Sequence, residues 1–253
     1  MAKVDAIIIG GGTISDPAFR AAAGVDCKSL ISISGKPMIY WVAKALKETP
    51  GIGSVVAIGP QTLLETELID VADHVLLEGE HEVVNLLRGM DAIPESERAL
   101  MVSGDTPLLT PEAVSDLIEN APEADIVYPT VGKDAIMSQF PDRKWIYIKA
   151  LEGEFTGSST VMFKPDVFRQ HQDTLKKVFD ARRSVADLVK MWGIGFALKF
   201  ALGQLSLKDA ERRISEVLNV NGRAYISEYP ELAFDVDKAS DIALAEARLS
   251  ERG

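Results

Sequence analysis

The chain is poor in the residue types that form disulfides and bind transition metals. Of its 253 residues, Cys27 is the only cysteine, and the three histidines, His74, His81 and His171, follow no metal-ligand spacing. One cysteine cannot form an intrachain disulfide, and cysteine-based zinc sites need at least two cysteines. The sequence therefore argues against a disulfide-stabilised fold and against a cysteine-based zinc site.

Positive charge is also scarce. The chain carries 27 Lys and Arg residues against 38 Asp and Glu residues, which gives a formal net charge of −11, and it has no long basic run. A protein that binds nucleic acid needs a basic patch or stripe for the phosphates, so we expect no nucleic-acid partner. A small anionic substrate is compatible with this acidity, because a few local cations and backbone N–H groups are enough to bind it.

Long apolar runs are missing as well. The nearly all-apolar segment Met191–Leu202 has 12 residues and contains Lys199, whereas a transmembrane helix needs about 20. Such a helix is expected to be buried in the core or at a subunit interface; a lid or a lipid-facing surface for an apolar substrate tail is the alternative. Because the apolar run Ala6–Ile9 is too short for a signal peptide, we expect no membrane span and a cytoplasmic location.

The chain does have a regular alternation of short apolar runs and helix-like segments. Buried strands, rich in Val and Ile, are predicted at Ala6–Ile9, Val55–Ile58, His74–Leu77, Ala99–Val102 and Ile126–Tyr128. Helices are predicted between them at Pro37–Lys47, Glu82–Met90 and Pro111–Glu119. This order predicts an α/β fold with a mostly parallel central sheet that is flanked by helices on both faces.

The pattern changes after Thr130. Strand-like runs at Trp145–Ala150 and Thr160–Phe163 flank a segment that contains Thr156 and Gly157, and this β excursion is expected to close over a site. Residues 165–218 are helical in character throughout and predict a helical insertion.

The remaining residues complete the predicted domain. A strand is expected near Arg223–Ile226 and a terminal helix at Ala239–Leu249. No repeat and no low-complexity tract divides the chain, so we expect one domain over residues 1–253.

Acidic residues follow apolar segments that lie far apart in the sequence. Asp105 comes just after the predicted strand Ala99–Val102, and Phe234 is followed by Asp235-Val-Asp237. Open α/β sheets bind ligands at the carboxyl ends of their strands, and Mg²⁺ prefers one or two carboxylates together with substrate oxygens. These carboxylates are therefore candidates for a metal site. Alone, Gly-Asp after a strand is more often a turn, and Asp237 would also serve to cap the last helix.

Three consecutive glycines, Gly10, Gly11 and Gly12, follow the first strand. Glycines at this place allow backbone N–H groups to approach phosphate oxygens. A dinucleotide fingerprint is incomplete, because Ser15 replaces the third glycine and a long loop rather than a helix is expected next. No Walker loop is present. The third interpretation joins the glycines to Lys28 and the segment that follows it, as in an enzyme that acts on a metal-bound nucleoside triphosphate.

In these motifs the chain resembles a known enzyme family. The first strand, the glycine loop, Lys28 and then Gly35-Lys-Pro-Met-Ile39 are similar to the start of nucleotidyltransferases with a glycosyltransferase-A-like, Rossmann-like fold. These include molybdenum-cofactor guanylyl- and cytidylyltransferases, sugar-1-phosphate nucleotidylyltransferases and the methylerythritol-phosphate cytidylyltransferase. Ser103-Gly-Asp-Thr-Pro-Leu-Leu109, Thr156-Gly157 and Asp235-Val-Asp-Lys-Ala-Ser-Asp241 resemble the later motifs, in family order.

The resemblance implies a function. It implies a Mg²⁺-dependent nucleotidyltransferase that joins the nucleoside monophosphate of a triphosphate to a phosphorylated acceptor and releases pyrophosphate. The partners would be a nucleoside triphosphate and a phosphorylated small molecule, with a homodimer as a further possibility. The nucleotide-binding half would be about 1–130, and the acceptor-binding half about 131–253, including the helical insertion.

The resemblance also implies site residues. Asp105 would bind Mg²⁺, and by register with the terminal family block Asp237 is favoured over Asp235 as the second ligand. Lys28 and the three glycines would bind phosphates, with Lys28 and Asp105 as catalytic residues. Thr156 and Gly157 would complete the substrate-binding set and contact the acceptor.

The chain departs from the family pattern in its glycine loop. The loop runs on to Arg20 and is longer than the family's Gly-x-Arg-Met, so the phosphate contact carries over to Arg20 less directly than to Lys28. Cys27 stands where the family has proline. The helical block from about Arg182 to Leu218 has no counterpart in shorter members and is expected to contact the second substrate or a second subunit.

Other interpretations stay open at this stage. Arg182 and Arg183 are candidates to bind an acidic group, although a solvated helix start also explains them. A non-catalytic relative that only binds nucleotide is compatible with the altered glycine loop. A glycosyltransferase of the same fold is the third possibility, although its Asp-x-Asp is expected in mid-chain rather than near the end.

Overall fold

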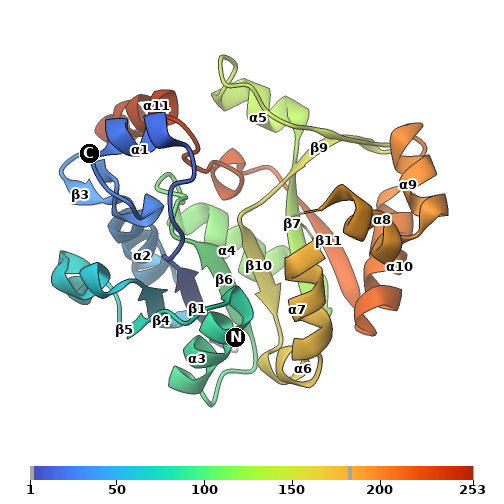
Figure 1. Cartoon of the computed structure of the whole chain (residues 1–253), viewed down its shortest axis with the longest axis horizontal. Helices are drawn as coiled ribbons and strands as arrows, with labels where there is room; N and C mark the ends of the chain where they lie inside the picture. Colours follow the sequence, from blue (N-terminus) through green and yellow to red (C-terminus); the bar gives the residue numbers. More distant parts are fainter. Residues whose placement is uncertain (1–2, 182–183, 253) are drawn as a thin grey trace.

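A nine-stranded sheet forms the centre of the protein in the computed structural model, which describes residues 3–181 and 184–252. Its strand order is β5-β4-β1-β6-β10-β7-β9-β8, with β11 beside β7 (Figure 1). The strands are β1 (Val4–Ile9), β4 (Ile52–Gly59), β5 (His74–Leu77), β6 (Ala99–Ser103), β7 (Ile126–Gly132), β8 (Ile148–Ala150), β9 (Gly153–Gly157), β10 (Thr160–Phe163) and β11 (Gly222–Ser227). Arg182 and Arg183 lie outside the described residues.

Helices connect and cover these strands. They are α1 (Pro17–Ala23), α2 (Met38–Glu48), α3 (Glu82–Ala92), α4 (Pro111–Asn120), α5 (Lys133–Gln139), α6 (Pro165–Gln170), α7 (Gln172–Ala181), α8 (Val185–Trp192), α9 (Ile194–Ala201), α10 (Leu207–Leu218) and α11 (Ala239–Arg252). A small hairpin, β2 (Ser32–Ile33) and β3 (Lys36–Pro37), precedes α2.

Most strands of the sheet run in one direction. β1 pairs in parallel with β4 and β6, β4 with β5, and β7 with β11. β10 lies antiparallel between β6 and β7, and β9 lies antiparallel to β7 and β8. The predicted α/β fold with a mostly parallel sheet is therefore confirmed. The β excursion differs from the prediction in one respect, because β10 belongs to the middle of the sheet and only β8 and β9 form a hairpin beyond it.

Both faces of the sheet are buried, since successive side chains of a strand point to opposite faces. Ala6 and Ile8 of β1 belong to one core cluster, together with residues of α2 and α4. Ile7 belongs to a second cluster on the other face, together with residues of α3 and α7. This arrangement leaves the loops at the carboxyl ends of the strands as the place where polar groups from several segments can meet.

Two helices begin as their sequences dictate. Thr110 caps α4 by accepting a hydrogen bond from Ala113 N at 3.2 Å, with a proline in the first turn. The Asp16 carboxylate caps α1 in the same way and accepts from Ala18 N at 2.7 Å. The expectation of a long loop after the glycines was therefore wrong, because the Asp16-Pro17 pair starts a short helix there.

The apolar segment Met191–Leu202 is divided and exposed. Gly193, with φ +87°, separates α8 from α9, and no residue of α9 is buried. Ile194 is 72% exposed and Leu198 is 57% exposed. The expectation that this segment is buried in the core was wrong, because α9 packs against α8 and none of its residues is buried, whereas its place at a subunit interface stays a prediction. Among the described residues no helix is both long and apolar enough to cross a membrane.

Candidate active site

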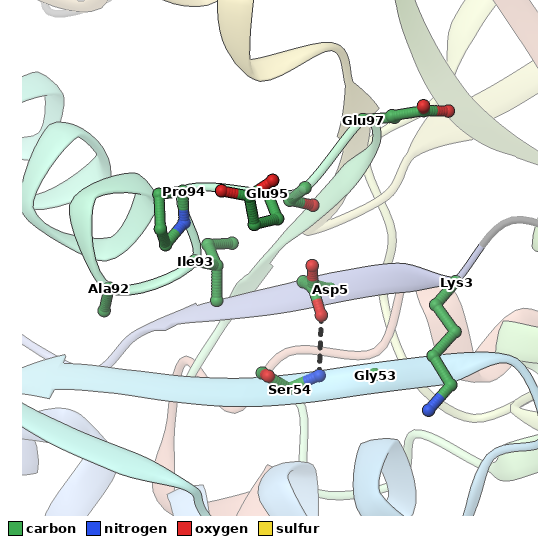
Figure 2. Close-up of a pocket in the computed structure, with 10 residues that line it drawn as sticks. Lys3, Asp5, Gly53, Ser54, Ala92, Ile93, Pro94, Glu95 and Glu97 are labelled. Atoms are coloured by element: carbon green, nitrogen blue, oxygen red, sulfur yellow. Dashed lines mark hydrogen bonds between the residues drawn. The ribbon is translucent and has the colours of Figure 1, made fainter.

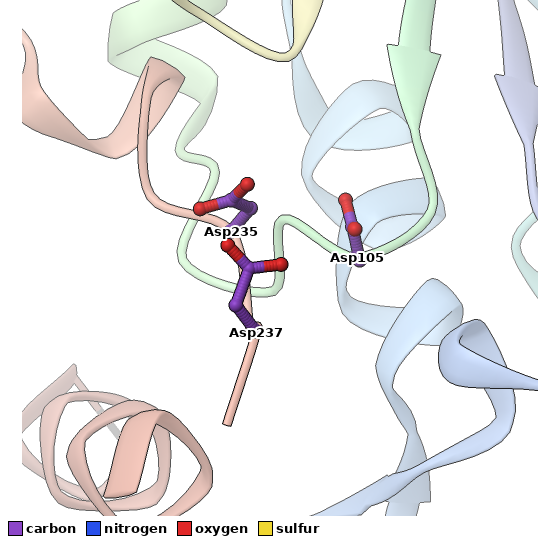
Figure 3. A group of neighbouring side chains, drawn as sticks. All are labelled: Asp105, Asp235 and Asp237. Carbon is purple, nitrogen blue, oxygen red and sulfur yellow. The ribbon is translucent and has the colours of Figure 1, made fainter. Parts of the chain in front are cut away.

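Three carboxylates meet at the carboxyl end of β6. Asp105 follows β6 directly, while Asp235 and Asp237 lie between a short 3₁₀ helix (Pro230–Leu232) and α11 (Figure 3). Oxygen atoms of the three carboxylates lie within 4.8 Å of one another. Val236 N donates to Asp105 O at 3.0 Å, so the backbone itself joins the two segments.

Lys28 faces this carboxylate cluster of Asp105, Asp235 and Asp237. Its Nζ donates to Asp105 Oδ2 and to Asp237 Oδ1, both at 2.6 Å. Burial acts to lower the pKa of Lys28, but the charges and hydrogen bonds of Asp105 and Asp237 outweigh it and raise the pKa above its usual value. Lys28 is therefore a permanent positive charge at this site.

The carboxylates are short of partners for their negative charge. Asp105 Oδ1 is buried and has no hydrogen-bond partner. Burial raises the pKa of Asp235, and the neighbouring charges of Asp237 and Asp105 raise it further. Hard oxygen donors at this separation, including one buried oxygen without a partner, fit a divalent cation such as Mg²⁺. They do not fit a soft metal, because neither cysteine nor histidine is part of the cluster.

The glycine loop packs tightly against the loop that carries Asp105. Gly104 N donates to Ile9 O at 2.9 Å. A Cβ at Gly104 would lie 3.1 Å from the Cα of Gly10, so the two loops touch backbone to backbone. Cys27 Sγ donates to Gly10 O at 3.2 Å, and Ser29 Oγ donates to the same oxygen. Cys27, which departs from the family pattern, thus holds the loop in place.

The three glycines differ in their surroundings. Gly12 has φ +97°, a conformation that disfavours side chains. A Cβ at Gly11 would lie 1.7 Å from a Glu78 carboxylate oxygen, so Glu78 covers this part of the loop. No sequence motif marks Glu78, which follows β5 and comes near the glycines because β5, β4 and β1 are neighbouring strands.

Arg20 does not reach the carboxylate cluster. Its Nε donates to Ile14 O at 2.9 Å and lies 3.8 Å from Asp26. The guanidinium therefore holds α1 against the loop that precedes it.

Thr156 and Gly157 lie at the end of β9, paired with Val131 and Thr130 of β7. A Cβ at Gly157 would lie 2.2 Å from the Tyr128 hydroxyl. Burial raises the pKa of Tyr128, and so does the negative charge of Asp235. Gly157 therefore contacts Tyr128, whereas Lys28 is in direct contact with the carboxylate cluster.

Ser159, in the turn after β9, bonds both the end of β6 and the 3₁₀ helix that precedes Asp235. Ser159 N donates to Leu232 O at 3.1 Å, and Ser159 O accepts from Ser103 N at 2.9 Å. The turn between β9 and β10 therefore lies between the end of β6, which leads to Asp105, and the 3₁₀ helix that leads to Asp235.

A cavity of about 640 Å³ lies at the opposite end of the strands, beside the starts of β1 and β4 (Figure 2). Lys3, Asp5 and Glu95 are among the residues that line it. Asp5 is turned to Ser54, whose backbone N donates to Asp5 Oδ1 at 2.6 Å. Because this cavity lies at the amino ends of the strands, it is separate from the carboxylate cluster.

Comparison with protein families gives one match that covers most of the chain. The model of the MobA-like NTP transferase domain matches residues 7–185, which include Lys28, Asp105 and the β8–β9 hairpin but end before Asp235.

Individual relatives agree with this match. The chain is 32% identical to a hypothetical transferase from Thermus thermophilus, with a TM-score of 0.83 over 95% of this chain and 99% of that one. It is 30% identical over 96 residues to the bifunctional protein GlmU of Thermoanaerobacter pseudethanolicus, a match over 36% of this chain and 20% of GlmU. A CMP:2-keto-3-deoxy-manno-octonic acid synthetase complexed with CTP superimposes over the full length of both chains, with a TM-score of 0.66. At 14% identity, that likeness shows a shared fold only.

Proposed function

The chain belongs to the family of MobA-like NTP transferase domains and is a nucleotidyltransferase; we propose that it joins the nucleoside monophosphate of a triphosphate to a phosphorylated small-molecule acceptor. Pyrophosphate is the other product, and Mg²⁺ is the cofactor. The observation that carries this proposal is the carboxylate cluster that faces Lys28 beside the glycine loop.

The reaction needs positioning and charge neutralisation rather than a protein nucleophile. A phosphate oxygen of the acceptor attacks the α-phosphorus, the bond from this phosphorus to the bridging oxygen breaks, and that oxygen leaves with pyrophosphate. Negative charge grows on the leaving oxygens, so a fixed cation nearby lowers the barrier. Lys28 supplies such a cation, and the N–H groups of the glycine loop supply donors for the same phosphates.

Asp105 and Asp237 are the proposed Mg²⁺ ligands, with Asp235 beside them. The metal, when bound, would neutralise charge on the triphosphate. Because Lys28 bonds one oxygen of Asp105 and one of Asp237, a bound cation would compete with its ammonium group for these carboxylates. We propose that the carboxylates bind the metal and that the Lys28 ammonium group then binds the phosphates of the triphosphate.

The acceptor is proposed to approach from the end of β9. The Thr156 hydroxyl offers a hydrogen bond to the acceptor, and beside it Gly157 leaves room for the Tyr128 hydroxyl. The support for this placement is that the turn after β9, which contains Ser159, lies between the end of β6 and the 3₁₀ helix that precedes Asp235.

A product assay tests the proposal. The protein is mixed with each of the four nucleoside triphosphates, with Mg²⁺ and with a panel of phosphorylated sugars, polyols and pterins. Pyrophosphate is measured, and the nucleotide product is identified by mass spectrometry. We expect one pair to release pyrophosphate, and we expect Asp105→Asn to abolish the release. Nucleotide binding without pyrophosphate for any acceptor would favour the non-catalytic alternative, and release of a nucleoside diphosphate from an activated sugar would favour the glycosyltransferase.

A further inference from the structure

Arg143 is a buried arginine in the segment between α5 and β8, and no sequence motif marks it. Its side chain is 7% exposed. Nη2 donates to the main-chain oxygen of Asp235 at 2.7 Å and to Asp235 Oδ1 at 3.0 Å. Nε donates to Asp241 Oδ1 at 3.2 Å, so one guanidinium group binds two acidic residues.

Asp241 extends this contact to the next member of the carboxylate cluster. Its side chain is 2% exposed, and its Oδ2 accepts from Asp237 N at 3.0 Å. Val236, between the two aspartates, donates its N–H to Asp105 O. Each of residues 235 to 237 is therefore fixed by a hydrogen bond, two of them through the Arg143–Asp241 pair.

Arg143 itself cannot reach a substrate. Its guanidinium carbon lies 4.1 Å from the ring centroid of Trp145 and 5.0 Å from that of Phe234, and these rings and its low exposure enclose it. Any effect of Arg143 on the reaction must therefore pass through Asp235 and Asp237.

We propose that Arg143 is a positioning residue that, together with Asp241, fixes the Asp235 and Asp237 carboxylates so that they can bind a divalent cation. The inference rests on the proposed function, because the cation is the one that the transfer reaction uses. Arginine suits this task since its planar fork can bind two carboxylates at once, whereas the single ammonium group of lysine cannot reproduce that geometry. Groups that orient metal ligands are typically worth about 10- to 100-fold in metal affinity.

Arg143→Lys is the main test, with Mn²⁺ alone as the probe and electron paramagnetic resonance as the readout of free Mn²⁺. We expect its dissociation constant for Mn²⁺ to rise about 10-fold or more. The Mg²⁺ concentration that half-saturates pyrophosphate release should rise by a similar factor, with kcat at saturating Mg²⁺ changed less. Asp241→Asn should show the same pattern, and it serves as the second variant if Arg143→Lys does not fold.

Arg248→Lys is the matched control. The Arg248 guanidinium lies 5.7 Å from the Phe140 ring centroid and bonds the main chain of Gln139, so it holds the same segment of chain from α11. It pairs with Glu251 at 3.1 Å and, within the described part of the chain, forms no ion pair with the carboxylate cluster. A general loosening of this segment should affect both arginine variants, whereas the positioning role affects Arg143→Lys alone.

The outcomes separate this inference from the proposed function. Unchanged Mn²⁺ affinity in Arg143→Lys, or an equal loss in Arg248→Lys, would overturn the inference even if the wild-type protein releases pyrophosphate. A wild-type protein that shows no Mn²⁺ site would also overturn it. If Mn²⁺ binding depends on Arg143 but no acceptor yields pyrophosphate, the inference stands and the proposed acceptor chemistry fails.

Discussion

At the scale of single residues, Lys28 is the cation in contact with the carboxylate oxygens of Asp105 and Asp237. It bonds two carboxylates at 2.6 Å each, and its pKa is raised by them. In Lys28→Ala we expect kcat and kcat/KM to fall together by about 100-fold or more, because a charge that acts on the leaving oxygens is lost in the transition state. Steady-state kinetics of pyrophosphate release would measure this.

Lys44→Ala is a suitable control for Lys28→Ala. Lys44 is a half-exposed residue of α2 that pairs with Glu48 at 3.9 Å. A change in KM alone for Lys28→Ala would mean that Lys28 contributes to binding and not to the chemical step.

Gly104 gives a second prediction at this scale. A Cβ there would lie 3.1 Å from Gly10 Cα and 3.2 Å from Ile9 O, both backbone atoms. Gly104→Ala should push the Asp105 loop away from the glycine loop and lower kcat/KM by about 10-fold or more, since small displacements of catalytic groups are costly. Gly195→Ala, in the exposed helix α9 and with open space around it, should leave kcat/KM unchanged. Equal activity of both variants would show that the two loops tolerate separation.

At the scale of secondary-structure elements, Asp125 joins the ends of three strands. Its Oδ2 accepts from Asn221 N at 2.9 Å, just before β11, and its Oδ1 pairs with Lys164 at 3.2 Å, just after β10. The hydrogen bond from Asn221 lowers the pKa of Asp125, burial opposes this, and Lys164 lowers it further. The charged form is therefore the one that stabilises the fold.

Asp125→Ala should lower the free energy of unfolding by about 1–3 kcal/mol at pH 7, as expected for hydrogen bonds to a charged group. Because the folded-state pKa is depressed, the contribution is complete above the unfolded-state pKa and is lost as the pH falls through the folded-state pKa. Urea unfolding at several pH values would measure this, with Asp26→Ala, at an 85% exposed side chain, expected to change little. A difference from wild type that grows toward acid pH would contradict the prediction.

Elements were predicted well where the pattern is local. The predicted bounds of β5 and β10 match the structure, because each is a short run of apolar residues between polar ones. β9 was missed, since Gly153 and Gly157 weaken the strand pattern and its pairing with β7 is a tertiary contact. The exposure of α9 could not be predicted either, because apolar composition alone does not show whether the rest of the fold provides a surface that covers the helix.

At the scale of the whole molecule, the site is an arrangement that the sequence indicates only in part. The position of Asp105 after a strand correctly indicated the carboxyl ends of the strands as the place of the site. The structure brings Asp105 together there with Lys28, Asp235 and Asp237. Arg143 gave no signal, because a single arginine in an irregular segment has meaning only through the residues that it contacts. Asp241 stands in the terminal motif, but its role depends on the hydrogen bond to Asp237 N. The roles of Lys28, Asp105, Asp237, Thr156 and Gly157 in the reaction stay predictions.

The contact between Lys28 and Asp237 joins residues that are 209 positions apart. A nascent chain of about two hundred residues therefore contains Lys28 and Asp105 but neither Asp235 nor Asp237, so its carboxylate cluster is incomplete. The nascent protein can form the parallel strands β1, β4, β5 and β6 by this point, yet it has no complete metal site. Affinity for the divalent cation should thus arise late in synthesis, so that metal binding adds its stabilisation only to the finished fold.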